Sequence, residues 1–170
     1  WEDEAGVAAV AAKLDVVFAG ESIRLSGEEV GEAIRTEEMS SGASKVAALP
    51  AVREALLFRQ RLFRRKPGLV GDGRDMGSVV FPDAGTKVFL TASVEIRAER
   101  RYKQLIAKGI AATMQPILQD LRERDERDST RSVAPLQQSA DAELLETSAL
   151  TIEQAVAKVL GWSSQVLHKQ

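Results

Sequence analysis

The sequence predicts a mixed α/β fold in which helices cover a parallel sheet. Short apolar runs at residues 87–90 and 144–145 each precede a stretch with helical periodicity, and strands that alternate with helices along a chain are typical of parallel sheets. At 170 residues the chain is long enough for one substantial core with a small additional lobe.

The first predicted element is a β-hairpin. Apolar residues alternate with polar or small ones over residues 14–18 and again over 23–25, with a glycine-containing turn at 19–21 between them. After the hairpin, Val30 and Ile34 indicate either a third short extended piece or a helical turn. This part of the chain is therefore expected to form a small lobe.

The middle of the chain is predicted to contain a hinge, a helix and a short strand. Residues 39–45 (MSSGASK) are small and polar, which is typical of a hinge. A helix is expected to begin at Pro50, because the missing N–H of proline is tolerated in a first helical turn, and to end at Lys66-Pro67. Residues 69–70 are predicted to form a strand that runs into a glycine-rich turn.

Two further helices have recognisable starts. Ser93 followed by Glu95 predicts a helix start after the run at 87–90. Thr151 with Gln154 three residues later forms a capping box that predicts another helix. The second helix is expected to have one apolar face, made of Ile152, Ala155, Val156, Val159 and Leu160.

The composition excludes several kinds of site. The chain has no cysteine, which excludes disulfides and thiolate zinc sites, and its single histidine, His168, is expected to be a surface residue rather than a catalytic base. No apolar run approaches about 18 residues, so no membrane span is expected, and the cytoplasm fits. The formal net charge of −2 gives no overall field that would attract nucleic acid. The chain opens on Trp1 rather than methionine, which suggests that a segment upstream has been cut away or left out.

The glycine-rich stretch GLVGDGRDMG (68–77) is the first candidate site. In parallel sheets, ligands bind beyond the carboxyl ends of the strands, where this stretch is predicted to lie. Its glycines are spaced G-x-G-x-x-x-G, which differs from the dinucleotide-binding fingerprint. From these residues alone two interpretations stay open: a tight turn with an exposed ion pair, or a backbone that approaches a phosphate or base held by Arg74 and Asp75.

A second candidate is the charged stretch LRERDERDSTR (121–131). On a helix, Arg124, Asp128 and Arg131 would project from one face. The two interpretations are a solvated helix with ion pairs and a phosphate clamp, in which guanidinium groups bind phosphoryl oxygens bidentately. A third basic group at helical spacing, for which a solvent-exposed face is favoured, consists of Arg97, Arg100 and Arg101.

Three stretches taken together resemble the bacterial cytidylate kinase family, of the P-loop nucleoside monophosphate kinase group. They are SKVAALPAVR (44–53), GDGRDMGSVVFPDA (71–84) and RERDERDSTRSVAPL (122–136), and the resemblance covers essentially the whole chain in order. The block GRDMGSVVFP is the most specific part. The resemblance implies transfer of the γ-phosphoryl group of ATP to CMP or dCMP, with Mg²⁺, by a cytoplasmic enzyme that is a monomer when complete.

The same resemblance implies a division of the chain. The expected architecture is a three-layer, P-loop NTPase-like α/β fold with a parallel sheet flanked by helices. Residues 1–43 would form a β-containing CMP-binding insert, and residues 44–170 the kinase core, with a short lid at about 101–126. The partners implied are CMP or dCMP and ATP, with no nucleic acid and no membrane.

The resemblance also implies roles for single residues. Cytosine would lie against Ser44, Arg53 and Asp75. This set is complementary to the base, since cytosine offers an amino donor to a carboxylate and two acceptors to arginine and serine. Uracil would turn an oxygen toward Asp75 instead. The phosphate and ribose of CMP would lie near Arg74, Arg124, Asp128 and Arg131, of which the three arginines are the catalytic candidates. Arg100 is a candidate for ATP binding, and no residue is assigned to a metal.

The sequence also departs from the family. It contains neither G-x-x-x-x-G-K-[ST], which holds the ATP phosphates, nor D-[ST]-G-x-x-Y-R. It therefore resembles a cytidylate kinase without its N-terminal P-loop part. We expect the chain as written to lack turnover. It is also expected not to fold alone into the native arrangement unless the central strand, between the Gly71 turn and the strand around Phe89, is supplied.

An alternative from another functional class is a non-enzymatic nucleic-acid-binding module that uses the arginine-rich helix face. The near-neutral charge and the lack of aromatic residues between the basic ones disfavour it.

Overall fold

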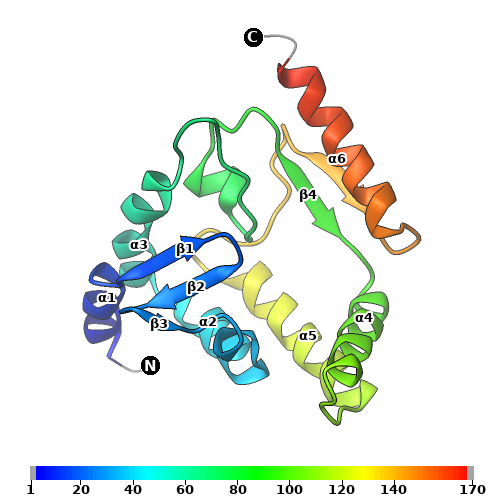
Figure 1. Ribbon diagram of the computed structural model, residues 1–170, viewed down its shortest axis with the longest axis horizontal. Coiled ribbons are helices and arrows are strands. Elements are labelled where there is room, and N and C mark those ends of the chain that lie inside the picture. The colour runs from blue at the N-terminus through cyan, green and yellow to red at the C-terminus, as the bar shows by residue number, and fades with distance from the viewer. Residues whose placement is uncertain (1–2, 168–170) are drawn as a thin grey trace. The chain divides into compact units, whose positions relative to one another are not determined.

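The computed structural model describes residues 3–167 (Figure 1). Its contacts divide the chain into two compact units. Unit 1 runs up to Gly71 and includes residues 131–133, and unit 2 consists of residues 72–130 and the chain from 134 onward.

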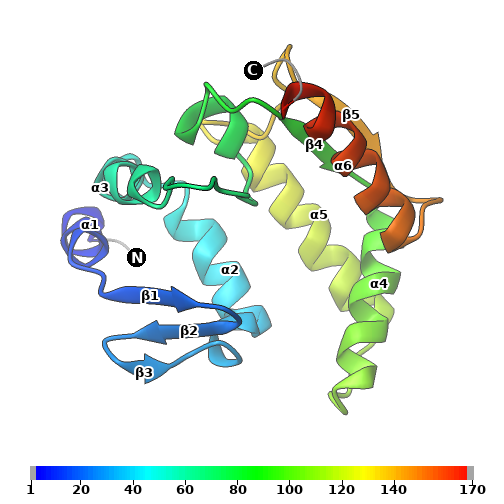
Figure 2. The ribbon, with the colours of Figure 1, turned by 45° about the horizontal axis from the view of Figure 1, so that its top comes forward.

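Unit 1 contains the predicted hairpin. Strands β1 (Val16–Ala19) and β2 (Ser22–Leu25) are antiparallel, and Gly20 has a positive φ of 60° in the turn between them. A short strand β3 (Glu28–Glu29) pairs with β2, so the three strands form one sheet (Figure 2). A 3-10 turn, η1 (Ala33–Arg35), follows. The hairpin prediction is confirmed, and both elements considered around residues 30–34 occur in succession.

The predicted hinge at residues 39–45 is wrong, because these residues lie in a helix, α2 (Glu37–Val46). Thr36 caps this helix, since its Oγ1 accepts a hydrogen bond from the backbone N–H of Met39 at 3.3 Å. The first turn is acidic and Lys45 lies in the last turn, which suits the helix dipole. The stabilisation of α2 by its cap and its terminal charges therefore outweighs the tendency of these small, polar residues to form a hinge.

The predicted helix start at Pro50 is confirmed by α3 (Pro50–Leu62), which ends earlier than expected. It packs against α1 (Glu4–Ala12). The carboxylate of Glu4 accepts a hydrogen bond from the backbone N–H of Ala51 at 2.8 Å, so a side chain of one helix caps the start of the other.

The strand predicted at residues 69–70 is absent from the structure. Val70 is fully exposed, and none of the described strands pairs with it. A strand needs a neighbour for its backbone N–H and C=O groups, and an apolar dipeptide alone does not provide one. The chain instead leads into a single π-helical turn, η2 (Met76–Val80), which begins where the backbone carbonyl of Asp75 accepts hydrogen bonds from Val79 and Val80 at 2.9 and 3.2 Å.

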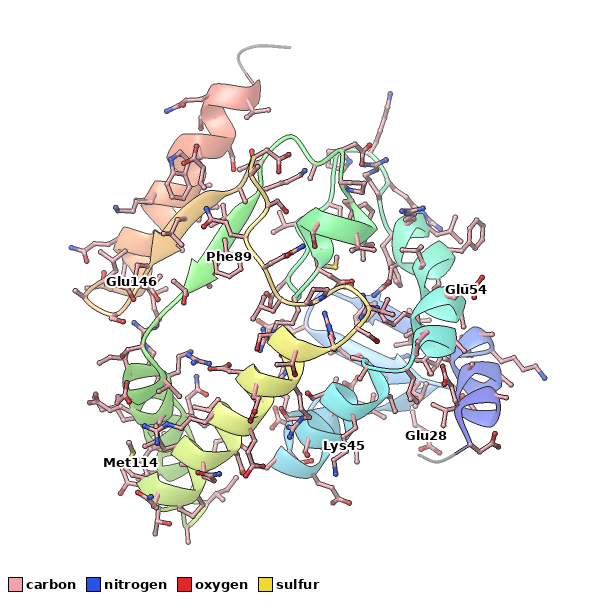
Figure 3. The ribbon with its side chains drawn as sticks, turned by 180° about the vertical axis from the view of Figure 1, so that it is seen from behind. Glu28, Lys45, Glu54, Phe89, Met114 and Glu146 are labelled. Atoms are coloured by element: carbon pink, nitrogen blue, oxygen red, sulfur yellow. The ribbon has the colours of Figure 1, made fainter. Side chains whose placement is uncertain are left out.

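Unit 2 contains the predicted parallel sheet. Strands β4 (Val88–Thr91) and β5 (Glu143–Glu146) pair in parallel from Val88 opposite Glu143 to Thr91 opposite Glu146. Figure 3 marks Phe89 in β4 and Glu146 at the end of β5. Within the described residues these two strands make up the whole sheet. The mixed α/β class with a parallel sheet is confirmed.

Helix α4 (Val94–Ala107) follows β4, and Ser93 caps it as predicted. Helix α5 (Met114–Thr130) runs beside α4 (Figure 2). The two helices share a buried apolar cluster of Ala98, Leu105 and Ile117. Partly buried residues packed against this cluster are Tyr102, Ala112, Leu118 and Leu121.

Helix α6 (Ile152–Leu167) begins at the predicted capping box, in which Thr151 and Gln154 exchange hydrogen bonds of 2.9 and 3.2 Å. Its expected apolar face is divided in two: Ala155 and Val159 are half-buried, whereas Ile152, Val156 and Leu160 are exposed. None of the helices in the described part of the chain is long and apolar enough to cross a membrane.

Candidate active site

Asp128 is the centre of the candidate site in unit 2. This α5 residue is only 3% exposed. Its Oδ2 accepts a hydrogen bond from Arg74 Nε at 2.9 Å, and Arg124 Nε, one helical turn earlier, lies 3.9 Å from the same oxygen. The structure thus brings together three of the predicted site residues, although Arg74 is 54 positions away from Asp128 in the sequence.

The local backbone explains how these side chains are positioned. Arg124 and Asp128 are four residues apart on α5 and therefore lie on one helix face. The backbone carbonyl of Asp128 also accepts a hydrogen bond from Leu136 N–H at 2.7 Å, which ties the end of α5 to the loop that follows. Arg74 is supplied by the glycine-rich stretch immediately before η2.

The cluster carries an excess of positive charge. Burial, with the neighbouring charge of Arg74, lowers the pKa of Arg124, and the carboxylate of Asp128 opposes this effect. Both guanidinium groups remain charged at neutral pH because arginine is so strongly basic. Two cations around one carboxylate leave a net positive charge, which favours binding of a phosphate.

Asp75 immediately follows Arg74 and is half-buried. Its backbone carbonyl holds the start of η2 through the two hydrogen bonds to Val79 and Val80. Single π-helical turns are frequent at functional sites, where they redirect neighbouring side chains. A π-helical turn at this position was not predicted from the sequence.

The remaining candidates for CMP belong to unit 1. Ser44 is buried on α2, and Arg53 on α3 donates from Nη1 to the carbonyl oxygen of Ala47 at 3.1 Å, at the end of α2. Arg131 directly follows α5, is half-buried and groups with unit 1. That these three residues and the Asp128 cluster serve one ligand stays a prediction.

Arg100, the candidate for ATP binding, has a structural partner. It donates hydrogen bonds to the Oγ1 and the backbone oxygen of Thr147 at 3.1 and 2.6 Å. Thr147 is buried and in turn donates to the Thr91 carbonyl oxygen from both its Oγ1 and its backbone N–H. Arg100 thus ties α4 to the ends of β4 and β5, and its role toward ATP stays a prediction. His168 lies outside the described residues.

No group of three His, Asp or Glu side chains that could hold a metal gathers anywhere in residues 3–167. Magnesium in phosphoryl-transfer sites is held by one or two carboxylates together with substrate phosphates. The described residues therefore do not form a magnesium cage of their own.

Arg97 does not lie on the solvent-exposed basic face that its sequence pattern favours. Arg97 instead forms a two-point ion pair with Asp125 of α5. The pairing joins residues 28 positions apart. In the sequence, the acidic residues within the stretch 121–131 were the one indication of a partner for Arg97.

Comparisons with known proteins show the family to which the chain belongs. A family model described as cytidylate kinase matches residues 1–165. The chain is 60% identical over 158 residues to a protein named cytidylate kinase from Bordetella pertussis, covering 93% of this chain and 71% of that protein. It is 59% identical over 162 residues to the cytidylate kinase of Chromobacterium violaceum, with 95% and 73% covered. For that of Cupriavidus pinatubonensis the identity is 56% over 165 residues, with 97% and 75% covered. With the Arg74, Arg124 and Asp128 cluster inside the matched region, the chain belongs to the cytidylate kinase family.

Proposed function

We propose that this chain serves the transfer of the γ-phosphoryl group of ATP to CMP or dCMP. The observation that carries the proposal is the pair of guanidinium groups, from Arg74 and Arg124, around the buried carboxylate of Asp128. Such a cluster suits a phosphate, and the family to which the chain belongs supplies the identity of the nucleotide.

In the proposed reaction an oxygen of the CMP phosphate attacks the γ-phosphorus of ATP. A new P–O bond forms, the bond from the γ-phosphorus to the β,γ-bridging oxygen breaks, and ADP leaves. The protein contributes position and charge rather than a covalent nucleophile. Arg74, Arg124 and Arg131 are proposed to stabilise negative charge on the phosphoryl oxygens, and Asp128 to orient Arg74.

Asp128 suits this orienting role because it is buried and anchored. Its carboxylate accepts the hydrogen bond from Arg74 Nε, which leaves the Nη donors of that guanidinium for other acceptors. A preorganised donor reorients little when the substrate arrives, which is the main advantage of such sites over water.

We further propose that Ser44, Arg53 and Asp75 read the cytosine ring. A carboxylate accepts from the N4 amino group, and hydroxyl and guanidinium groups donate to O2 and N3. ATP is the proposed phosphate donor, with Arg100 as a candidate contact. Magnesium enters only as the companion of the ATP phosphates. We propose that the enzyme, when complete, acts as a monomer in the cytoplasm, where a chain without cysteine is at no disadvantage.

A thermal-shift comparison tests the nucleotide class. CMP is expected to raise the unfolding temperature of the chain more than cytidine does, because only CMP carries the phosphate. A short cytidine-containing RNA at equal nucleotide concentration is expected to have a smaller effect. Stabilisation by the RNA but not by CMP would favour the nucleic-acid-binding alternative instead.

A further inference from the structure

Arg97 connects three elements of unit 2 through one guanidinium group. Its Nε donates to the carbonyl oxygen of Ala92, directly after β4, at 3.1 Å. Its Nη1 donates to Asp125 Oδ1 at 2.9 Å, and its Nη2 donates to the other oxygen of the same carboxylate. The end of the strand, the first turn of α4 and the second half of α5 are therefore joined at this residue.

This contact differs from the apolar packing between the two helices. The buried cluster and its neighbours engage α5 no further along than Leu121. The part of α5 that bears Arg124 and Asp128 begins after this point. Arg97 and Asp125 form a two-point contact between α4 and this part of α5. A bidentate contact restrains rotation as well as distance.

A second ion pair joins the same helices and provides a comparison. Arg122 of α5 lies 3.3 Å from Glu95 of α4 through a single contact, and the two side chains are 55% and 63% exposed. The side chains of Arg97 and Asp125 are only 31% and 38% exposed. Exposed single-point pairs contribute little to stability or position, so the Arg122 pair is a suitable control.

Asp125 lies next to Arg124 and three residues before Asp128 in the same helix. Because a helix is stiff over one turn, a shift or rotation of the backbone at Asp125 moves both of these side chains. A displacement of about 1 Å is enough to impair a preorganised site.

We propose that Arg97 and Asp125 are positioning residues, which hold α5 so that Arg124 meets the phosphate of the nucleotide and Asp128 orients Arg74 toward it. This inference rests on the proposed function, since it takes the Asp128 cluster to be the phosphate site. It assigns no contact between Arg97 or Asp125 and the substrate. Their effect is exerted only through the placement of α5.

The test compares CMP with cytidine, because only CMP presents a phosphate. Dissociation constants of both are measured by calorimetry on the full chain and on Asp125→Asn, which keeps the shape of the side chain but loses its charge. We expect CMP binding to weaken about tenfold, equivalent to roughly one charge-assisted hydrogen bond. Cytidine binding should stay unchanged, because its contacts are proposed to lie elsewhere.

Two further variants complete the test: a second variant of the ion pair and a control. Arg97→Lys keeps the positive charge but cannot form the two-point contact, so it should also lose CMP affinity while keeping that for cytidine. It provides the same test if Asp125→Asn fails to fold. Glu95→Gln, which removes the exposed pair between the same helices, should leave both constants at the values of the parent chain. Circular dichroism confirms that each variant is folded.

The outcomes separate the two hypotheses. If the parent chain binds CMP no better than cytidine, the proposed phosphate site is wrong. The positioning role, which depends on that site, is then wrong as well. If the parent prefers CMP and both variants keep the full preference, only the positioning role is overturned. An equal loss of CMP and cytidine binding in the folded variants would also overturn it, since this would indicate a general structural effect.

Discussion

Asp128 is buried and has two neighbouring cations, Arg74 and Arg124. Buried carboxylates are tolerated where charged donors satisfy them. Arg74 supplies the direct hydrogen bond, and Arg124 supplies further positive charge. Burial and these two guanidinium groups therefore hold the carboxylate of Asp128 in place.

Replacing Asp128 with asparagine should therefore reduce both stability and phosphate binding. The variant leaves Arg74 and Arg124 without a compensating charge, and we expect the free energy of unfolding to fall by about 1 to 3 kcal/mol, a range that allows for the partial exposure of Arg74. Urea denaturation measures the change. Asp141→Asn, which alters an exposed partner of Lys87, is the control and should have a smaller effect. A variant as stable as the parent would contradict this account of the cluster.

Asp75→Asn tests the proposed reading of cytosine. An amide can donate to the oxygen of uracil that a carboxylate repels, so CMP should bind more weakly and UMP less unfavourably than in the parent. Losing a charged hydrogen bond costs about 1.5 to 3 kcal/mol. Calorimetric titration with both nucleotides gives the ratio of the dissociation constants of CMP and UMP. Equal affinities for CMP and UMP in the parent, unchanged in the variant, would remove Asp75 from the base site.

At the level of elements, local hydrogen bonds stabilise the start of α6 and the three-stranded sheet of unit 1. The capping box of α6 satisfies two backbone N–H groups, those of Thr151 and Gln154. In unit 1 the carboxylate of Glu29 performs a similar task for the sheet, since it accepts hydrogen bonds from the backbone N–H groups of Ile23 and Gly31 at 3.1 and 3.2 Å and from the hydroxyl of Ser22.

Thr151→Ala should destabilise α6, because the side-chain acceptor for the Gln154 N–H is lost. Removing a threonine cap costs about 1 kcal/mol. The change is measured by thermal or urea unfolding. Ser164→Ala removes a hydroxyl from the last turn of the same helix, where Oγ donates to the Leu160 carbonyl oxygen, and should have a smaller effect. A larger loss in Ser164→Ala would show that the box is not what stabilises this helix.

The stability that Glu29 contributes is expected to depend on pH in a definite direction. Hydrogen bonds from Ser22 and from the Ile23 backbone lower the pKa of Glu29 below its ordinary value of 4.5. A folded-state pKa below the unfolded value contributes stability above the unfolded pKa and loses it as the pH falls through the folded pKa. Glu29→Gln should therefore be less stable than the parent at neutral pH, and the difference should shrink in acid. Glu28→Gln, from the same short strand, is the control. A difference that grows as the pH falls would refute this assignment.

At the level of the whole chain, the segment around the boundary at Gly71 is exposed. All residues from 61 to 74 are exposed, and the compact units divide at Gly71. Exposed segments with few packed contacts are the preferred sites of proteolysis.

Limited trypsin digestion should accordingly cut first at Arg64 or Arg65 and release fragments that correspond to the two sides of this segment. Mass spectrometry identifies the first cut. Arg97 and Arg100 serve as internal controls, because both lie in α4 and form hydrogen bonds with other elements. An initial cut within α4 or α5 would show that the helices open more readily than the segment around residue 65.

The elements that could be predicted from sequence depend on interactions within a few residues. The hairpin, the starts of helices at Pro50, Ser93 and Thr151, and the two parallel strands all follow from capping, turn residues or short-range periodicity. The local arrangement of Arg124 and Asp128 on one helix face was predictable for the same reason. Residues 39–45 were misassigned because the cap at Thr36, which lies before them, was not weighed.

The class of fold, the family and the residue types available to bind a phosphate follow from the sequence alone. Which of these residues meet depends on the tertiary structure, because Arg74 reaches Asp128 through the path of the backbone between them and not through their spacing in the sequence. The tertiary structure likewise decided that Arg97 pairs with Asp125 and that residues 69–70 form no strand. A strand and an ion pair each need a partner from elsewhere in the chain, and no pattern within one segment specifies that partner.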